Sequence, residues 1–331
     1  RIFGITSRQL VFESKRRVGS LNVATGVLSW ATPEDDQKKP KFASRTGPEG
    51  GLNIYQFSPR LGQVFLKKRT TRPLLRTGAS HEWGFQFSED SHRLVVADRT
   101  ALNLYSQRLQ PLWEHRTASK IDCGPLIVGD RLFIGEENGK LKCLSLSKGG
   151  NALWSVDTEE RLYGPIIASS GQDEFLLASS LEGSLFAVSP TDGKEKWRQN
   201  LGDRIVGLPL FTESAVAVAS GTGSIKLLDK QTGKILYERR QTSGLQCLVP
   251  AGKGNSRLAV SDIDGNLLFL SAENLKPIRS LKFQAPLSSL ASALAVPLSL
   301  AGEEDSAGEL EHLVIAADRA GVIYLMDAEG F

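Results

Sequence analysis

The fold is decided by two stretches that repeat one another, Gly183-Ser-Leu-Phe-Ala-Val-Ser-Pro-Thr-Asp-Gly193-Lys-Glu-Lys-Trp197 and Gly223-Ser-Ile-Lys-Leu-Leu-Asp229-Lys-Gln-Thr-Gly233-Lys-Ile-Leu-Tyr237. In both, a large aromatic residue follows the first glycine by fourteen positions. Asp-Gly and Thr-Gly pairs favour the tight turns that need a positive φ. Apolar and polar residues alternate before the turn, which is the period of a β-strand. Each stretch therefore predicts two short strands joined by a turn.

The same unit recurs along the whole chain. Its anchor positions are residues 30, 75, 113, 154, 197, 237 and 279, with gaps of 38 to 45 residues. Four short antiparallel strands in about 40 residues make one propeller blade. A helical solenoid would show helical spacing of apolar residues, and none is present. We predict an all-β fold, an eight-bladed β-propeller of four-stranded antiparallel blades, with seven blades as the alternative.

We expect a single propeller domain over residues 1–331, with blades at approximately 1–30, 51–77, 81–115, 123–156, 163–199, 205–240, 245–281 and 290–331. Residues 32–51 and the acidic stretch 301–311 fall between blades and are predicted to be exposed loops. The last blade lacks a sequence for its outer strand, so we expect it to be incomplete at the C-terminus unless another segment completes it. The chain opens at Arg1 without an initiator methionine or a leader, as a mature segment or an excised domain would.

The large residue on the last strand of each unit is predicted to fill the space between neighbouring blades. A buried tryptophan removes about 150–250 Å² from water. Prolines such as Pro125, Pro165, Pro209 and Pro250 are predicted at the starts of strands, where a missing N–H is tolerated.

Composition excludes several classes of partner and structure. Lys plus Arg number 40 and Asp plus Glu 37, so the net charge of +3 gives no broad field for nucleic acid. No apolar run reaches the roughly 18 residues of a membrane helix. The chain has three cysteines, and we predict that Cys123, Cys143 and Cys247 are free thiols.

Reactive residues do not cluster in the sequence. None of the histidines (His81, His92, His115 and His312) has a second ligand at metal-binding spacing. The stretch from Asp262 to Asn266 resembles a calcium loop but lacks its further acidic positions, so it is predicted to be a hairpin turn. We therefore predict no catalytic, cofactor-binding or metal-ligating residue and no cofactor. The basic runs at 15–17 and 67–69 are interpreted as charged strand edges, with an anionic partner patch as the alternative.

The unit from Asp229 to Tyr237, with Thr232-Gly233 followed by an aromatic residue, resembles the repeat of pyrroloquinoline-quinone-like propellers. The resemblance extends over nearly the whole chain and is specific for the fold. That family includes quinoprotein dehydrogenases, sensor domains of receptor kinases and the propeller lipoprotein of the outer-membrane β-barrel assembly machine. Catalysis by the quinone would imply adjacent cysteines and a calcium site of Glu, Asn and Asp, and this sequence has neither. The resemblance therefore points to the non-catalytic branch, similar to the assembly lipoprotein.

Three functions remain open from the sequence. The first is a non-enzymatic scaffold that binds other proteins of unknown identity, acting as a cell-envelope assembly factor. The second is the ligand-sensing ectodomain of a larger receptor or kinase, and the third a quinone-dependent dehydrogenase. The resemblance implies the periplasm or cell envelope, whereas unpaired cysteines favour the cytoplasm. We expect a monomeric propeller or a part of a larger complex.

Overall fold

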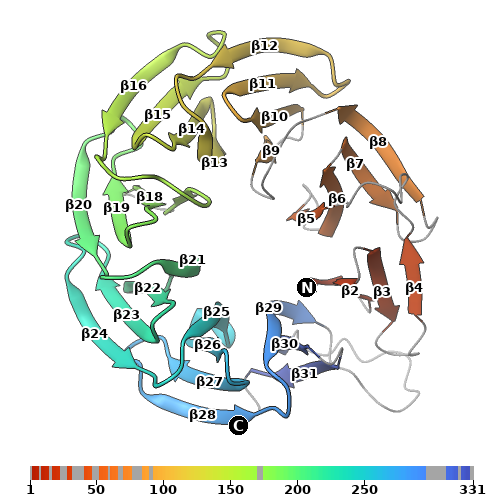
Figure 1. Cartoon of the computed structure of the whole chain (residues 1–331), viewed down its shortest axis with the longest axis vertical. Coiled ribbons are helices and arrows are strands. Elements are labelled where there is room, and N and C mark those ends of the chain that lie inside the picture. The colour runs from red at the N-terminus through yellow and green to blue at the C-terminus, as the bar shows by residue number, and fades with distance from the viewer. Residues whose placement is uncertain are drawn as a thin grey trace.

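The computed structural model describes residues 2–6, 9–14, 17–22, 28–31, 41–46, 52–58, 60–65, 70–76, 84–88, 92–169, 174–295, 311–319 and 322–328. In these residues the chain forms antiparallel sheets arranged around a centre (Figure 1). Seven sheets have four strands and one has three. One short 3-10 turn at Lys253–Asn255 is the only helical element of the described part. The predicted all-β propeller is confirmed.

The first sheets are built from strands consecutive in the chain. Their strands are β1 (Ile2–Thr6), β2 (Gln9–Ser14), β3 (Arg17–Asn22) and β4 (Leu28–Ala31); β5 (Lys41–Thr46), β6 (Leu52–Ser58), β7 (Arg60–Phe65) and β8 (Thr70–Arg76); β9 (Phe85–Phe87), β10 (Arg93–Asp98), β11 (Ala101–Ser106) and β12 (Pro111–Arg116); and β13 (Ile121–Val128), β14 (Arg131–Glu136), β15 (Lys140–Ser145) and β16 (Ala152–Asp157).

The remaining sheets follow the same order. Their strands are β17 (Ile167–Ala168), β18 (Leu176–Ser179), β19 (Ser184–Val188) and β20 (Glu195–Asn200); β21 (Ile205–Phe211), β22 (Ala215–Ser220), β23 (Ser224–Asp229) and β24 (Ile235–Arg240); β25 (Leu245–Ala251), β26 (Arg257–Asp262), β27 (Asn266–Ser271) and β28 (Pro277–Lys282); and β29 (Leu287–Ala295), β30 (Glu311–Asp318) and β31 (Ile323–Asp327).

The core lies between the sheets. Every residue of β22 is buried, although most of β24 in the same sheet is exposed. Val218 of β22 belongs to one apolar cluster with Leu185 of the preceding sheet, and such clusters join each described pair of neighbouring sheets from β9 to β31. A single blade cannot bury both faces, so stacking the blades produces the core. β1 lies beside β29, which brings the first and last sheets together (Figure 1).

Three tryptophans on outermost strands connect neighbouring blades. Each indole N–H donates a hydrogen bond to a backbone carbonyl in the outer turn of the next sheet, namely Trp113 to Leu146 at 3.0 Å, Trp154 to Pro190 at 3.1 Å and Trp197 to Lys230 at 2.8 Å. The same turn places a glycine under the ring, where an added Cβ would lie within 3.0 Å of it, at Gly150, Gly193 and Gly233 respectively. The predicted role of the anchor residue is confirmed at these three positions.

The anchor prediction is wrong at Tyr237, whose side chain is 46% exposed. In the turn between the two outermost strands of the next sheet, β27 and β28, Leu275 takes the position that glycine has in the three turns that contact tryptophan. Leu275 adopts a φ of 58° and is 3% exposed. Because Leu275 packs into the apolar cluster of this seam, the leucine supplies the packing there and the tyrosine lies outside. The side chains of Trp30 and Leu75 lie outside the described part of the structure.

The start of the second blade differs from the sequence prediction. Residues 41–46 form β5, the first strand of the second sheet, and are not an exposed loop. β5 pairs with β6 over its whole length, so this blade begins before residue 51. Residues 32–40, 47–51 and 301–310 lie outside the described residues. The last sheet has three strands in its described part.

The prolines were predicted at strand starts, but several lie inside innermost strands. Pro125 and Pro209 fall where the registers of β13 and β21 shift, between Cys123 and Leu126 and between Val206 and Leu210. Pro250 lies within β25. Innermost strands are edge strands, and an edge or a bulge tolerates a residue without an N–H. Cys123 and Cys247 also lie within innermost strands, β13 and β25.

The carboxylate of Asp229 organises the turn that carries the repeat motif. It accepts hydrogen bonds from the Thr232 hydroxyl at 2.7 Å, the Thr232 N–H at 2.8 Å and the Gln231 N–H at 3.1 Å. These bonds, the Thr232 hydroxyl first, lower the pKa of Asp229. A lowered folded pKa adds stability above the unfolded value of about 3.9, and this stability is lost as pH falls through the folded pKa.

We therefore expect that in Asp229→Asn the free energy of unfolding depends less steeply on pH below about pH 5 than in the wild type. The asparagine oxygen still accepts hydrogen bonds but does not titrate in this range. Urea unfolding midpoints at pH 5, 4, 3 and 2 measure the slope. The wild type should lose more stability than the variant over this range, and parallel profiles would contradict the assignment.

Candidate binding recess at the centre of the ring

The innermost strands surround a recess of about 600 Å³. Five consecutive sheets contribute to its wall through β9, β13, the segment before β17, β21 and β25 (Figure 1). The wall includes Gln86, Leu126, Ile166, Leu208 and Gln246. A cavity of this size, lined by apolar and polar groups together, has the character of a small-ligand site.

One side of the recess is held by hydrogen bonds between inner strands of different sheets. The Gly124 N–H donates to the Gly164 carbonyl at 3.0 Å, and the Gly164 N–H donates to the Asp122 carbonyl at 3.0 Å. This short parallel bridge joins the sheet of β13 to the sheet of β17. Gln86 adds a contact from the preceding sheet, because its Oε1 accepts the Ile127 N–H at 2.9 Å. The wall is therefore connected across three sheets.

An irregular segment of β21 projects an apolar side chain at the recess. The register of β21 against β22 shifts between Val206 and Leu210. Within this bulge Gly207 has a φ of 72°, and Leu208 is 43% exposed. β-bulges re-aim side chains near functional sites. Leu208 is thus available for contact with a bound molecule.

The charged group of the recess is Arg204. Its guanidinium carbon lies 5.2 Å from the centre of the Tyr163 ring, a cation–π distance. Both residues line the recess, and Arg204 is exposed. The described part of the recess wall contains no other ionisable side chain except Tyr163. The wall therefore carries one positive charge among polar and apolar groups.

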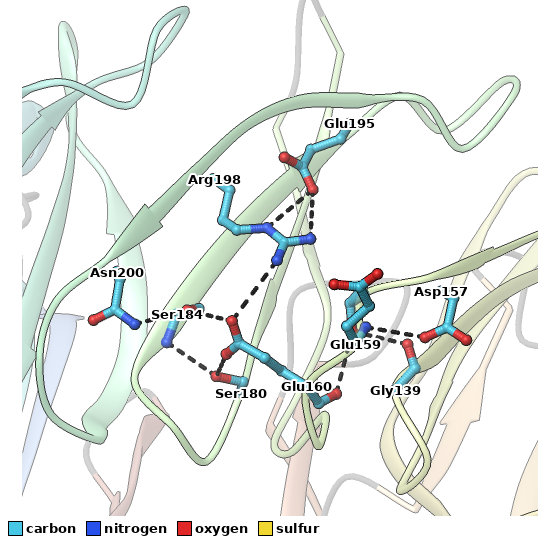
Figure 2. Close-up of polar contacts among 10 residues, drawn as sticks. Gly139, Asp157, Glu159, Glu160, Ser180, Ser184, Glu195, Arg198 and Asn200 are labelled. Carbon is cyan, nitrogen blue, oxygen red and sulfur yellow. Dashed lines mark hydrogen bonds and ion pairs between the residues drawn. The ribbon is translucent and has the colours of Figure 1, made fainter.

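The nearest acidic side chains are bound to turns. Figure 2 shows the Glu160 carboxylate between two serines of the next sheet, accepting the Ser180 hydroxyl at 2.6 Å and the Ser184 hydroxyl at 2.9 Å. Arg198 lies 3.8 Å from the same carboxylate and is held on its other side by Glu195. The segment before Glu160 is fixed as well, since the Thr158 hydroxyl donates to the Gly139 carbonyl at 2.8 Å.

Asp203 repeats this arrangement one blade later. Its Oδ2 accepts the Thr222 N–H at 2.7 Å, in the turn between β22 and β23. Glu160 and Asp203 are thus used to join the segments between blades to the turns of the following sheet. Neither residue lines the recess or forms an ion pair with Arg204.

We expect Glu160→Gln to lower the free energy of unfolding by about 1–2 kcal/mol, because one of the two serine hydroxyls loses a charged acceptor. Chemical denaturation followed by circular dichroism measures this loss. Glu159→Gln is the matched control, because Glu159 is exposed and its substitution removes the same negative charge. Equal effects of the two variants would show that the serine contacts contribute nothing.

The sequence predicted no site residue, and it did not identify the recess. The stretch from Asp262 to Asn266 is a turn, as predicted, because Asp262 accepts the N–H groups of Asp264 and Asn266. No group of three potential metal ligands occurs among the described residues. His81 and most of both basic runs lie outside the described residues, so the anionic-patch alternative stays a prediction.

All three cysteines are free, as predicted. Burial raises the pKa of Cys123 to about 12 and that of Cys143 to about 11, and it also raises that of Cys247. The thiolate is the reactive form of cysteine. These thiols are therefore packing groups at neutral pH.

Comparison with known proteins identifies the repeat. The family described as outer membrane protein assembly factor BamB matches residues 137–276. BamB of Alkalilimnicola ehrlichii is 27% identical over 161 residues, which are 45% of this chain and 40% of that protein. The chain forms a PQQ-like propeller similar to BamB. BamB of Burkholderia pseudomallei is 26% identical over 169 residues, covering 50% of this chain and 42% of that protein.

Solved structures support the fold over nearly the whole chain. The crystal structure of BamB from Moraxella catarrhalis superposes with a TM-score of 0.63 at 16% identity, covering 99% of this chain and 96% of that one. The computationally designed Ika8 protein superposes with a TM-score of 0.73 at 12% identity, covering 98% and 96%. The sequence similarity to the curated BamB proteins spans about two fifths of their length. The BamB-like segment includes Tyr163, Arg204 and Gln246 of the recess.

Proposed function

We propose that this protein is a non-catalytic scaffold that binds other proteins during outer-membrane protein assembly in the cell envelope. The observation that carries the proposal is the BamB similarity of residues 137–276, which lie in consecutive sheets on one side of the ring. The relatives are named as assembly factors, and the chain has their PQQ-like repeat.

The architecture suits a scaffold. A binding surface is most effective when it is already ordered before the partner arrives. Here the segments between blades are fixed to the next sheet by contacts such as Glu160 with Ser180 (Figure 2). Backbone bonds repeat this connection, as in the Ile263 N–H donating to the Gly244 carbonyl at 2.9 Å. Exposed loops on a rigid frame are common sites of partner contact.

Among the described residues no helix has the length and apolar character needed to cross a membrane.

In vivo photo-crosslinking tests this proposal. A photoreactive amino acid replaces Ile263, which lies in the turn between β26 and β27 within the BamB-like segment and is 51% exposed. Leu112 is the matched control, because it is 53% exposed but lies on β12 outside that segment. We expect adducts with outer-membrane assembly proteins from position 263 only.

Deletion of the gene provides the second readout. The amount of folded outer-membrane β-barrel proteins should fall in the deletion strain and return on expression of the wild-type chain. Unchanged amounts of these proteins, together with identical adducts at positions 263 and 112, would refute the assembly role.

A further inference from the structure

The recess combines three chemical features that belong to one type of ligand. The first is the Arg204 guanidinium, which stacks on Tyr163 and forms no ion pair with a described acidic residue. Asp203 precedes Arg204 in the chain and accepts the Thr222 N–H, and Glu160, three residues before Tyr163, accepts the Ser180 and Ser184 hydroxyls. An arginine that is held against an aromatic ring and whose guanidinium N–H groups remain available is suited to bind a carboxylate.

The second feature is an acceptor without a donor. The Oε1 atom of Gln246 is buried and has no hydrogen-bond partner in the described part of the structure. Gln86, also in the wall, differs because its Oε1 accepts the Ile127 N–H at 2.9 Å. A buried acceptor left unpaired is costly, and a turn of the Gln246 side chain toward the recess would let a ligand N–H pair with its Oε1 atom.

The third feature is the apolar surface between these polar groups. Leu126, Ile166, Val206 and Leu208 line the recess, and Leu208 is 43% exposed. The volume of about 600 Å³ accommodates a ligand of a few residues. An apolar side chain of the ligand would cover Leu208 and remove it from water.

We propose that the recess binds short apolar peptides through their free C-terminal carboxylate. The carboxylate pairs with Arg204, the adjacent peptide N–H donates to Gln246, and the last side chain packs on the apolar wall. This inference goes beyond the assembly role, because it assigns a small-ligand site at the centre of the ring and does not depend on which protein the ring binds.

Isothermal titration of the full chain with three probes tests the site. Acetyl-Leu-Phe with a free carboxylate should bind. Its C-terminal amide should bind about 10- to 100-fold more weakly, the range for loss of a hydrogen bond to a charged group. Octanoate, which has a carboxylate and no N–H, should also bind more weakly than the free dipeptide acid. Equal binding of the acid and the amide, or no binding of the acid at millimolar concentration, would overturn the proposal.

Variants assign the contacts. Arg204→Gln should reduce binding of the acid to the level of the amide, whereas Arg240→Gln, on the exposed outer strand β24, should leave it unchanged. Gln246→Leu should weaken the binding of the dipeptide acid but should leave the binding of octanoate unchanged. Unchanged thermal unfolding confirms that each variant is folded. If Arg204→Gln binds the acid as the wild type does, the site is wrong, and the crosslinking result at position 263 is unaffected.

Discussion

Replacing Trp197 with alanine is expected to lower the free energy of unfolding by about 3–5 kcal/mol, the usual cost of removing a buried large aromatic side chain. Trp197 is 6% exposed and belongs to an apolar cluster that contains Phe175 of its own sheet and Leu228 of the next sheet. Its ring centroid lies 6.2 Å from that of Phe175. The variant leaves a cavity, and it also leaves the Lys230 carbonyl without the indole N–H that it accepts at 2.8 Å.

Urea unfolding followed by far-ultraviolet circular dichroism measures the effect without relying on tryptophan emission. Tyr237→Ala is the control, because Tyr237 holds the same place in the next repeat but is 46% exposed. Its loss should cost about 1 kcal/mol or less. Similar losses for the two variants would contradict the view that the buried indole joins these blades.

Trp197→Phe separates the two contributions of the indole. Phenylalanine keeps an apolar ring in the seam but has no N–H for the Lys230 carbonyl. We expect a loss intermediate between wild type and alanine, since a typical hydrogen bond contributes about 0.5–1.5 kcal/mol. A loss as large as that of alanine would show that the fit of the indole, and not its area, decides the stability of the seam.

The fold was predictable because its determinants are local and repeated. The glycine turns and the aromatic residue fourteen positions later mark the same strands in unit after unit, as at Gly183 and Trp197. Alternation of apolar residues then gives strands, and the repeat length gives a blade. No single unit had to be interpreted correctly for the ring to be recognised.

Errors arose where one unit departs from the others. The strand Lys41–Thr46 follows a charged, proline-containing stretch, and no Asn-Gly, Asp-Gly or Thr-Gly pair separates the two. Tyr237 matches the anchor position, yet Leu275 in the facing turn takes the buried space. The identity of an anchor therefore depends on a residue 38 positions away, a pairing that inspection of one repeat does not show.

The recess was missed for a related reason. Tyr163, Arg204 and Gln246 are separated by about one repeat each, and none has a reactive neighbour in the chain. They meet because each lies at the inner end of its own sheet. The signal that could have found them is the alignment of first strands, in which these residues flank the same position as Cys123 and Cys247. A pocket composed of one residue from each blade has no local motif.

Replacing Gly233 with alanine tests the other side of the tryptophan contact. Gly233 has a φ of 67°, and an added Cβ would lie 2.5 Å from the Trp197 ring. The left-handed backbone costs about 1–2 kcal/mol for a residue with a Cβ. Overpacking against the indole adds about 1–3 kcal/mol. The sum predicts a loss of about 2–5 kcal/mol in urea unfolding.

Gly202→Ala isolates the cost of the left-handed backbone. Gly202 has a φ of 80°, but nothing lies within 4 Å of its added Cβ, so this variant should lose only the backbone part. In a Trp197→Ala background the clash at Gly233 disappears, and Gly233→Ala should then cost no more than Gly202→Ala. Additive losses for the Trp197 and Gly233 substitutions would refute direct contact, because residues that share a packing site couple and distant ones do not. Strong coupling would instead explain why the tryptophan-bearing repeats are followed by a glycine turn, whereas the tyrosine-bearing repeat is followed by leucine.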